Sequence, residues 1–544
     1  MSSRAARALQ RGIFLRRQFL ASLGRAREEH ERFLMKTLRD NAETAFGREH
    51  GFAEIVDVAT FRRRIPIRGY DALAPWIDRV EAGEHAVLTA EDPFALLRTS
   101  GTTGRSKRIP ITKRHGLLEF QAQWIAWGAV FEAYPELAAR DDSTLNLAYD
   151  PAEPAAGGVP SLSGTQLTLR TGNLDPMEGF PGAAAPWSVP PARLTTYEDR
   201  TYFRLRLAVE SEALLAIMTL NPSSLVALAE QMTRAWPRLL AEIRDGTCLG
   251  EPGRPPNAAR AAALGLLGAA PRPEQVWPNL RLLRCWTGAS AGRYLAHVRE
   301  LYGAAVTIWP QQTVASEGTM AVPMEREGGS VLQIDKGFFE FLPADREVTP
   351  EAETLLPHEV EVGREYLLIQ TRANGLYRYD IGDLFRVTAL VGGVPHVDFI
   401  GRKAGFSSFT GEKLTEAQAG AAAERALEAC TLAAASYTWF PRWGRPPHYL
   451  FLVEPRQPWA EDAGAALALE LDRQLGEHNE EYPGKRASGR LGPVHVTLAP
   501  PGAFRAHWRR RIEMGAAATQ VKDRVLQPNE DLLAELLGEP GEGG

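Results

Sequence analysis

Residues 97–112 read L-R-T-S-G-T-T-G-R-S-K-R-I-P-I-T. Glycine lets the backbone turn sharply and approach a ligand closely, because it has no Cβ. Backbone N–H groups, hydroxyls and an ammonium are the donors that a polyphosphate needs. The spacing from Gly101 to Lys107 is not the G-x-x-x-x-G-K-[ST] spacing of the common phosphate loop. By itself the stretch predicts either an anion-binding loop or a polar turn between a strand and a helix.

The composition is that of a multi-domain globular protein. The 544 residues are 44% hydrophobic and 24% charged, which allows two or three domains. A net charge of -5 argues against a general role in binding nucleic acid or a membrane surface. The three cysteines, Cys248, Cys285 and Cys430, form no C-x-x-C pair, which fits a reducing compartment. No apolar run reaches the length of a membrane span, so we expect a cytoplasmic protein.

The first third of the chain predicts helices around the opening stretch. The pattern from the N-terminus to Leu38 predicts one amphipathic packing helix with a basic outer face. A polar, hairpin-like segment is expected to end over Gly83–Leu88. Thr112 is a good N-cap for a long helix over residues 113–133. Trp124, Trp127 and Phe131 lie at helical spacing on it, which is typical of core packing and also allows a wall of a substrate pocket.

Apolar runs separated by helical patterns follow, over residues 214–220, 280–285 and 305–309. This alternation predicts a parallel sheet that is covered on both faces. Asn221 is expected to cap the helix that Pro222 begins. Ligands of such sheets bind at loops that leave the carboxyl ends of the strands. We expect the loops T-G-A-S (287–290) and A-S-E-G (315–318) at such ends.

From Ser330 the pattern changes to short strands with glycine turns. The predicted strands are 331–334, 338–342, 366–372, 376–379 and 384–387, and Asn374-Gly375 is a hairpin signal. After Gly401 the sequence predicts a smaller α+β unit, with helices from about Thr415 and over 467–478 and strands over 449–453 and 494–498. The fold class is therefore α/β: a large N-terminal domain (1–398) with parallel-rich sheets covered by helices plus a small β-subdomain, a hinge (399–402), and a smaller mobile α+β C-terminal domain (403–544).

Several residues in these loops have the chemistry of a nucleotide site. Glu317 follows a predicted strand in a glycine-flanked loop, where a carboxylate beside a polyphosphate suits Mg²⁺. Asp383 ends Y-R-Y-D-I-G-D, and a carboxylate there can accept hydrogen bonds from ribose hydroxyls. Arg402 falls at the hinge, and Lys413 and Lys522 are candidate cations near the C-terminal unit.

Gly288-Ala289-Ser290-Ala291-Gly292 suggests a different function, because it satisfies the G-x-S-x-G pattern of a hydrolase nucleophile elbow. Asp383 and His396 would then complete a triad in the right order. This interpretation leaves the S-G-T-T-G loop unexplained.

The order S-G-T-T-G-x-x-K, T-G-A-S, A-S-E-G, Y-D-I-G-D, F-I-G-R and a C-terminal lysine resembles the luciferase-like adenylate-forming superfamily. Within it, the chain is most similar to the auxin-responsive acyl-acid amido synthetase (Gretchen Hagen 3) family. The motifs specific to that family are N-A-E-T-A-F-G-R-E-H-G-F (41–52), R-I-P-I-R-G-Y-D-A-L-A-P-W-I (64–77) and T-S-G-T-T-G-R-S-K-R-I-P (99–110). Further matches to the family are G-L-Y-R-Y-D-I-G-D (375–383), G-E-K-L-T-E (411–416) and Q-V-K-D-R (520–524).

The resemblance implies an ATP site. It implies Glu317 as the Mg²⁺ ligand, Lys413 or Lys522 near the α-phosphate, and the following residues at ATP: Ser100, Gly101, Thr102, Thr103, Lys107, Gly288, Ala289, Ser290, Ser316, Asp383, Phe399 and Arg402. The chain departs from the family at Thr313, where an aromatic residue is usual, and at Asp523, where a proline is usual.

The implied reaction is ATP-dependent amide formation. A small carboxylic acid becomes an acyl-adenylate, and an amine, which we expect to be that of an amino acid, then takes the acyl group. Acyl-CoA ligation is the alternative that shares the first step, and serine hydrolysis through Ser290 is a distant one. Trp124, Trp127 and Phe131 are the acid-pocket candidates. The expected partners are small molecules, with neither nucleic acid nor membrane, in a monomer or weak homodimer.

Overall fold

The computed structural model describes residues 3–98, 107–147, 161–162, 182, 185–194, 196–402, 406–407, 412, 414–442, 444, 446–479, 482–487, 491–514, 524–527 and 531–538. Two compact units divide the chain. The larger unit comprises Met1–Thr287, Tyr294–Ile381 and Phe385–Phe399. The smaller unit comprises Gly288–Arg293, Gly382–Leu384 and Ile400–Gly544.

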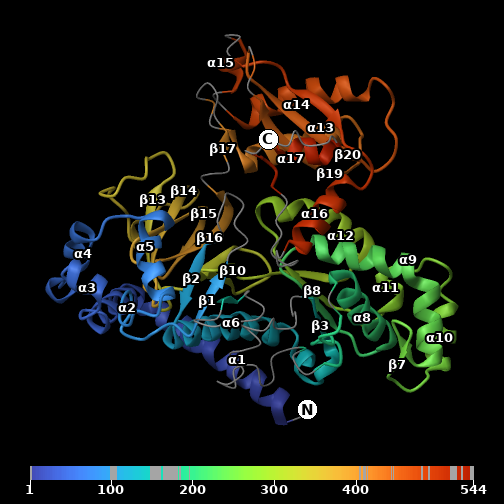
Figure 1. The fold of residues 1–544 in the computed structure, drawn as a ribbon, viewed down its shortest axis with the longest axis horizontal. Helices are drawn as coiled ribbons and strands as arrows, with labels where there is room; N and C mark the ends of the chain where they lie inside the picture. Colours follow the sequence, from blue (N-terminus) through green and yellow to red (C-terminus); the bar gives the residue numbers. More distant parts are fainter. Residues whose placement is uncertain are drawn as a thin grey trace. The chain divides into compact units, whose positions relative to one another are not determined.

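The N-terminal helical segment is interrupted, so the prediction of one helix to Leu38 was wrong. Helix α1 (Ser3–Ser22) ends in a 3₁₀ turn (Leu23–Arg25), and α2 (Ala26–Asp40) follows. Arg25 leaves the helical region of backbone space, with φ -126° and ψ 32°. The break lets the two helices meet different partners, because α1 packs on α6 (Lys113–Ala133) and α2 packs on β13 (Phe338–Pro343) (Figure 1).

The prediction of a hairpin-like segment after Ile67 and through Leu88 was also wrong. Helix α5 (Tyr70–Glu81) lies there, and residues 83–88 contain turns and bends. Two shorter helices, α3 (Ala45–Glu49) and α4 (Val58–Arg64), precede it. Leu73, Ile77 and Val80 on α5 are buried at helical spacing, which gives the helix one apolar face. That periodicity in Y-D-A-L-A-P-W-I-D-R-V-E was the signal for a helix.

Strand β1 (Ala95–Arg98) lies antiparallel to β2 (Arg108–Ile111), with Arg98 opposite Arg108. On its other edge β1 pairs in parallel with β4 (Ser161–Leu162). The predicted helix over 113–133 is confirmed as α6, and its N-cap is also confirmed, since the Thr112 hydroxyl accepts from His115 N at 3.2 Å.

The predicted parallel sheet is confirmed. Its strand order is β3-β5-β8-β9, and every neighbouring pair is parallel. The bounds are β3 Thr144–Asn146, β5 Ala216–Met218, β8 Leu282–Cys285 and β9 Thr307–Pro310. Successive residues of these strands point to opposite faces of the sheet, and they belong to two different hydrophobic clusters. Both faces of the sheet are therefore covered.

The green helices in Figure 1 gather around this sheet. They are α8 (Tyr197–Glu210), α9 (Ser223–Asp245), α10 (Ala258–Gly265), α11 (Pro273–Val276) and α12 (Leu295–Tyr302). Helix α9 begins one residue later than predicted, because Pro222 is its N-cap residue. Asn221 still serves the helix start, since its Oδ1 accepts from Ser223 N at 3.0 Å.

A seven-stranded sheet has the order β10-β11-β12-β16-β15-β14-β13. Its other strands are β10 Thr313–Ala315, β11 Gly318–Pro323, β12 Ser330–Leu332, β14 Glu365–Thr371, β15 Tyr379–Val391 and β16 Val394–Arg402. Residues 376–379 are not the separate strand that we predicted. The segment 372–378 instead joins β14 to its neighbour β15, with Arg372 N donating to the Leu376 carbonyl at 2.8 Å.

The position predicted for A-S-E-G was also wrong. It lies in the tight turn of the antiparallel β10–β11 hairpin, not at the end of a parallel strand. Ala315 pairs with Gly318, so Ser316 and Glu317 form a two-residue connection. Gly318 has φ +130°, a conformation that L side chains rarely adopt, and this permits the sharp reversal.

The smaller unit contains the sheet β19-β20-β21 (Ala434–Arg442, His448–Pro455 and His495–Leu498). Its helices are α13 (Glu416–Ala429), α14 (Ala463–His478), α15 (Tyr482–Ala487), α16 (Ala503–Glu513) and α17 (Asp531–Leu537). The helix predicted from about Thr415 is confirmed as α13, and Thr415 is its N-cap residue, with a capping box shared with Gln418. The two-domain α/β class is thus confirmed. No helix in the described part of the chain has the length and apolarity that a membrane crossing requires.

Candidate functional site

Three of the predicted motifs meet in one chain of hydrogen bonds. Lys107 Nζ donates to the Tyr379 hydroxyl at 3.1 Å, and that hydroxyl donates to Glu317 Oε1 at 3.2 Å. Lys107 also lies over the rings of Tyr70 and Tyr379, 5.5 and 5.8 Å from their centroids. Glu317 is 3% exposed and Tyr379 is fully buried. These contacts join the end of the S-G-T-T-G-R-S-K stretch to A-S-E-G through the first residue of β15.

Each of these side chains is held by its local backbone. Lys107 directly precedes β2, and Glu317 is held in the β10–β11 turn. Tyr379 forms a bridge with Arg68, in which Arg68 N donates to the Arg378 carbonyl at 3.0 Å and Asp380 N donates to the Arg68 carbonyl at 2.8 Å. The R-I-P-I-R-G-Y motif therefore fixes the start of β15, which explains why it accompanies the site motifs.

An ion pair between Arg372 and Glu119 lies beside the turn that holds Glu317. Arg372 Nη2 lies 2.5 Å from Glu119 Oε1 on α6, and Glu119 Oε2 accepts from Thr319 N at 2.6 Å. A Cβ on Gly318 would lie 2.2 Å from Arg372 Nη2, so any larger residue would have to displace the paired guanidinium. The glycine of A-S-E-G is thus required by the close approach of this pair as well as by its backbone angle.

The electrostatics of this region set one buried cation, Arg372, against two carboxylates. Burial lowers the pKa of Arg372, and the carboxylates of Glu119 and Glu317 act in the opposite direction. Burial also lowers the pKa of His115, one turn before Glu119, to about 4, so that it is neutral at pH 7. Glu317 is therefore held within electrostatic reach of Arg372 as well as bonded to Tyr379.

We expect Glu119→Gln to destabilise the larger unit by about 1–3 kcal/mol, because it removes the charged hydrogen-bond partner of the buried Arg372. Chemical denaturation monitored by tryptophan fluorescence would measure this. The matched control is Glu132→Gln on the same helix, whose partners Arg16 and Arg17 include an exposed arginine. Equal stability of Glu119→Gln and the wild type would contradict the role given to the pair.

The other site residues named from the sequence are distributed as follows. Ser316 lies in the Glu317 turn, Asp383 is buried on β15, and Phe399 contacts the Phe385 ring at 5.6 Å. Ala289 and Ser290 lie on a 3₁₀ helix (Ala289–Tyr294) that Gly288 precedes, and Arg402 ends β16. Ser100, Gly101, Thr102, Thr103, Lys413 and Lys522 lie outside the described residues. The nucleotide roles of this set stay predictions.

Trp124, Trp127 and Phe131 are almost completely buried, in one cluster with Met218 and Trp309 of the parallel sheet. This placement puts them against the β5 and β9 face of that sheet. Their role in an acid pocket stays a prediction.

Three residues of the site were missed. Tyr379 stood inside the quoted Y-R-Y-D-I-G-D motif, and only its Asp was singled out. Arg372 and Glu119 carried no local signal, because an arginine at a strand end and a glutamate on a helix are usually solvated. The two residues are 253 positions apart in the sequence, and only the folded structure shows that they form a pair.

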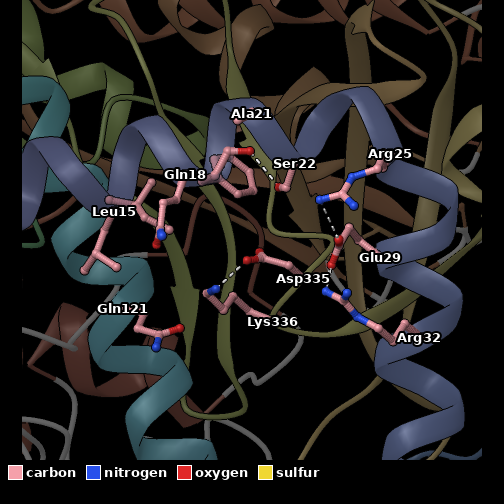
Figure 2. A pocket seen from close by; sticks show the side chains of 12 residues that line it. Leu15, Gln18, Ala21, Ser22, Arg25, Glu29, Arg32, Gln121, Asp335 and Lys336 are labelled. Atoms are coloured by element: carbon pink, nitrogen blue, oxygen red, sulfur yellow. Dashed lines mark hydrogen bonds and ion pairs between the residues drawn. The ribbon is translucent and has the colours of Figure 1, made fainter.

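A cavity of about 450 Å³ in the same unit is lined by other residues (Figure 2). Its lining comes from α1, α2, α6 and the loop before β13 and includes the ion pairs Arg25–Glu29 and Lys336–Asp335. None of the site residues named from the sequence lines it.

The histidine that the hydrolase interpretation requires has a different partner in the structure. His396 Nδ1 lies 3.1 Å from the Gly328 carbonyl oxygen, so this nitrogen is engaged by backbone and not by Asp383. A triad requires that nitrogen to be oriented by the acid.

Comparisons with known proteins agree with the motifs. The GH3 family N-terminal domain matches residues 15–307, the GH3 family central domain matches 330–402, and the GH3 family C-terminal domain matches 416–531. A probable indole-3-acetic acid-amido synthetase GH3.12 of Oryza sativa subsp. japonica is 26% identical, over 90% of this chain and 89% of that protein. A jasmonoyl--L-amino acid synthetase GH3.5 of the same organism is 25% identical, over 93% of each chain.

A solved structure, GH3.15 acyl acid amido synthetase, shares the fold, with a TM-score of 0.82, 20% identity and coverage of 96% of this chain and 95% of that one. The site motifs, the fold and the three matched domains agree, and the chain belongs to the GH3 family.

Proposed function

We propose that this protein is an ATP-dependent acyl-acid amido synthetase, which activates a small carboxylic acid as its acyl-adenylate and transfers the acyl group to the amine of an amino acid. The observation that carries the proposal is the Lys107–Tyr379–Glu317 chain, which unites three nucleotide-type motifs in one buried cluster. Membership of the GH3 family and the amido synthetase names of its relatives support it.

The chemistry requires activation, because a carboxylate and an amine at neutral pH form a salt and not an amide. Attack of the carboxylate on the α-phosphorus of ATP gives the acyl-adenylate and releases pyrophosphate. The neutral amine then attacks the acyl carbon, and AMP leaves. Charge that develops on the phosphate oxygens is stabilised by fixed donors such as ammonium and backbone N–H groups.

The assignment of residues to ATP follows the same logic. The S-G-T-T-G loop and Lys107 would bind the phosphates, the T-G-A-S loop would border adenine, and Asp383 would bind ribose. Lys107 suits this role because its ammonium is already held over two tyrosine rings at the end of the loop. Lys413 or Lys522 would reach the α-phosphate, and Phe399 and Arg402 would form the hinge at which the chain passes between the two units.

The residues present fit one Mg²⁺ bound together with ATP. Among the residues that the structure describes, no group of three acidic, histidine or cysteine side chains is placed to hold a metal by itself. Mg²⁺ commonly uses one or two carboxylates with substrate phosphates and water, and Glu317 would be that carboxylate. When bound, the ion would neutralise phosphate charge, while Tyr379 holds the Glu317 carboxylate in place.

The test is acid-dependent exchange of labelled pyrophosphate into ATP with a panel of small acids, which detects the first step alone. The best acid is then incubated with each amino acid, and separately with CoA, and the products are identified by mass spectrometry. Exchange followed by amide formation supports the proposal. A CoA thioester as the product, or ATP binding without exchange for any acid, would refute it.

We expect Tyr379→Phe to lower exchange by about 10-fold, because it removes the hydroxyl that orients Glu317 and leaves Lys107 without that acceptor. The measurement is the exchange rate with the best acid as a function of Mg²⁺ concentration. Tyr366→Phe is the control, since its buried hydroxyl accepts from Glu361 N at 3.0 Å elsewhere in the sheet. Similar losses in both variants would mean that the effect is structural.

A further inference from the structure

Arg284 on β8 is a buried cation, and none of the carboxylates in the described part of the chain forms an ion pair with it. It is 1% exposed, and among the described residues its polar contacts are a hydrogen bond from Nη2 to Gln312 Oε1 at 3.0 Å and a cation–π contact with Trp127, 4.5 Å from the ring centroid. Its Nε has no hydrogen-bond partner, and the described residues place no carboxylate against it. A buried charge in this state is unusual, because desolvation has to be compensated by an anion.

Other fully buried arginines of the larger unit show how the same fold treats this problem. Three of them form an ion pair with a glutamate: Arg206 with Glu210 at 2.7 Å, Arg372 with Glu119 at 2.5 Å and Arg378 with Glu340 at 3.0 Å. Burial lowers the pKa of Arg284 to about 9, and no neighbouring acid acts in the opposite direction. Gln312 and Trp127 offset only part of the desolvation of a guanidinium.

The position of Arg284 points to a ligand. One row of register partners crosses the parallel sheet and comprises Asn146, Met218, Arg284 and Trp309. Partners in such a row share a face, and here that face packs against Trp124 and Trp127 of α6. The row lies one residue before the carboxyl end of β8, where ligands of parallel sheets bind. The Trp309 indole N–H, next to Arg284 in the row, is a second buried donor without a partner.

We infer that Arg284 binds a second carboxylate on the acid substrate, so that the enzyme selects acids with an apolar body between two carboxylates. One carboxylate is activated at ATP, and the other neutralises Arg284 among the aromatic side chains of α6. The inference rests on the proposed function, and it names the substrate class for it. It also gives the unpaired donors of Arg284 and Trp309 an acceptor.

The first test is the exchange assay with matched acids: terephthalic acid against its monomethyl ester and benzoic acid, and adipic acid against hexanoic acid. The wild type should prefer at least one diacid to its monoacid partner. Arg284→Met should lower kcat/KM for that diacid by about 10²–10³-fold and leave the monoacid nearly unchanged. Arg284→Lys keeps the charge but loses the forked donor, so its kcat/KM for the diacid should lie between the values of the wild type and Arg284→Met.

Arg281→Met is the matched control, because it removes an exposed arginine just before the same strand and should not alter the preference. The KM for ATP should not change in Arg284→Met. A raised KM for ATP would show that Arg284 serves a phosphate, and this would overturn the inference. So would a panel in which no diacid exceeds its monoacid partner.

Thermal unfolding and calorimetric binding give a readout that is independent of turnover. Without acid, Arg284→Met should melt a few degrees higher than the wild type, because an unpaired buried charge is replaced by an apolar side chain of similar length. A lower melting temperature would indicate a structural role and contradict the inference. Binding of the preferred diacid that depends on Arg284, in a protein without exchange, would refute the proposed function but support this site.

Discussion

Glu317→Gln is expected to lower acid-dependent pyrophosphate exchange by about 10²–10³-fold, the cost of one lost charged group at a phosphate-transfer site. The amide keeps an oxygen that accepts from Tyr379, so the fold around β10 and β11 should be unchanged. It loses the negative charge that Mg²⁺ requires and that faces Arg372. Exchange rates over a range of Mg²⁺ concentrations would show the loss and a higher Mg²⁺ requirement.

The control for this variant is Glu325→Gln. Glu325 is exposed just after β11, so it offers the same chemical change on the same strand pair without the buried partners. Unchanged exchange and an unchanged Mg²⁺ requirement in Glu317→Gln would remove Glu317 from the metal site, and the proposed ATP geometry would have to be revised.

Lys413→Ala and Lys522→Ala are expected to separate the two half-reactions. Replacing the lysine that reaches the α-phosphate during adenylation should lower the exchange rate by about 10²–10³-fold, because the charge that develops on the phosphate then lacks one charged donor. The other variant should retain exchange. Transfer from preformed acyl-adenylate to the amino acid, measured in a single turnover, reports the second step for each variant.

Lys36→Ala is the matched control, since Lys36 is an exposed lysine that pairs with Asp40 on α2 at 2.8 Å. Undiminished exchange in both Lys413→Ala and Lys522→Ala would show that the assignment of these lysines is wrong. A loss in both would indicate that one lysine also positions the smaller unit for adenylation.

Local patterns predicted most of the elements because they depend on near neighbours. Thr112 caps a helix as its hydroxyl predicted, and the apolar runs of the parallel sheet formed strands. The wrong predictions of secondary structure fell in segments whose residue pattern fits more than one structure. The N-terminal helix breaks at Arg25 because its two halves pack on different partners, and Tyr70–Glu81 forms a helix because its apolar face is buried.

The sequence by itself determined the family-type motifs, the α/β class and the expected chemistry of Glu317, Asp383 and the S-G-T-T-G stretch, because motif spacing and residue type are local properties. Only the tertiary structure decided that Glu317 lies in a hairpin turn, that Tyr379 connects it to Lys107, and that Arg372 is paired while Arg284 is not. The physical reason is that a charge reveals its role only through burial and partners, and these come from residues that lie far apart in the chain.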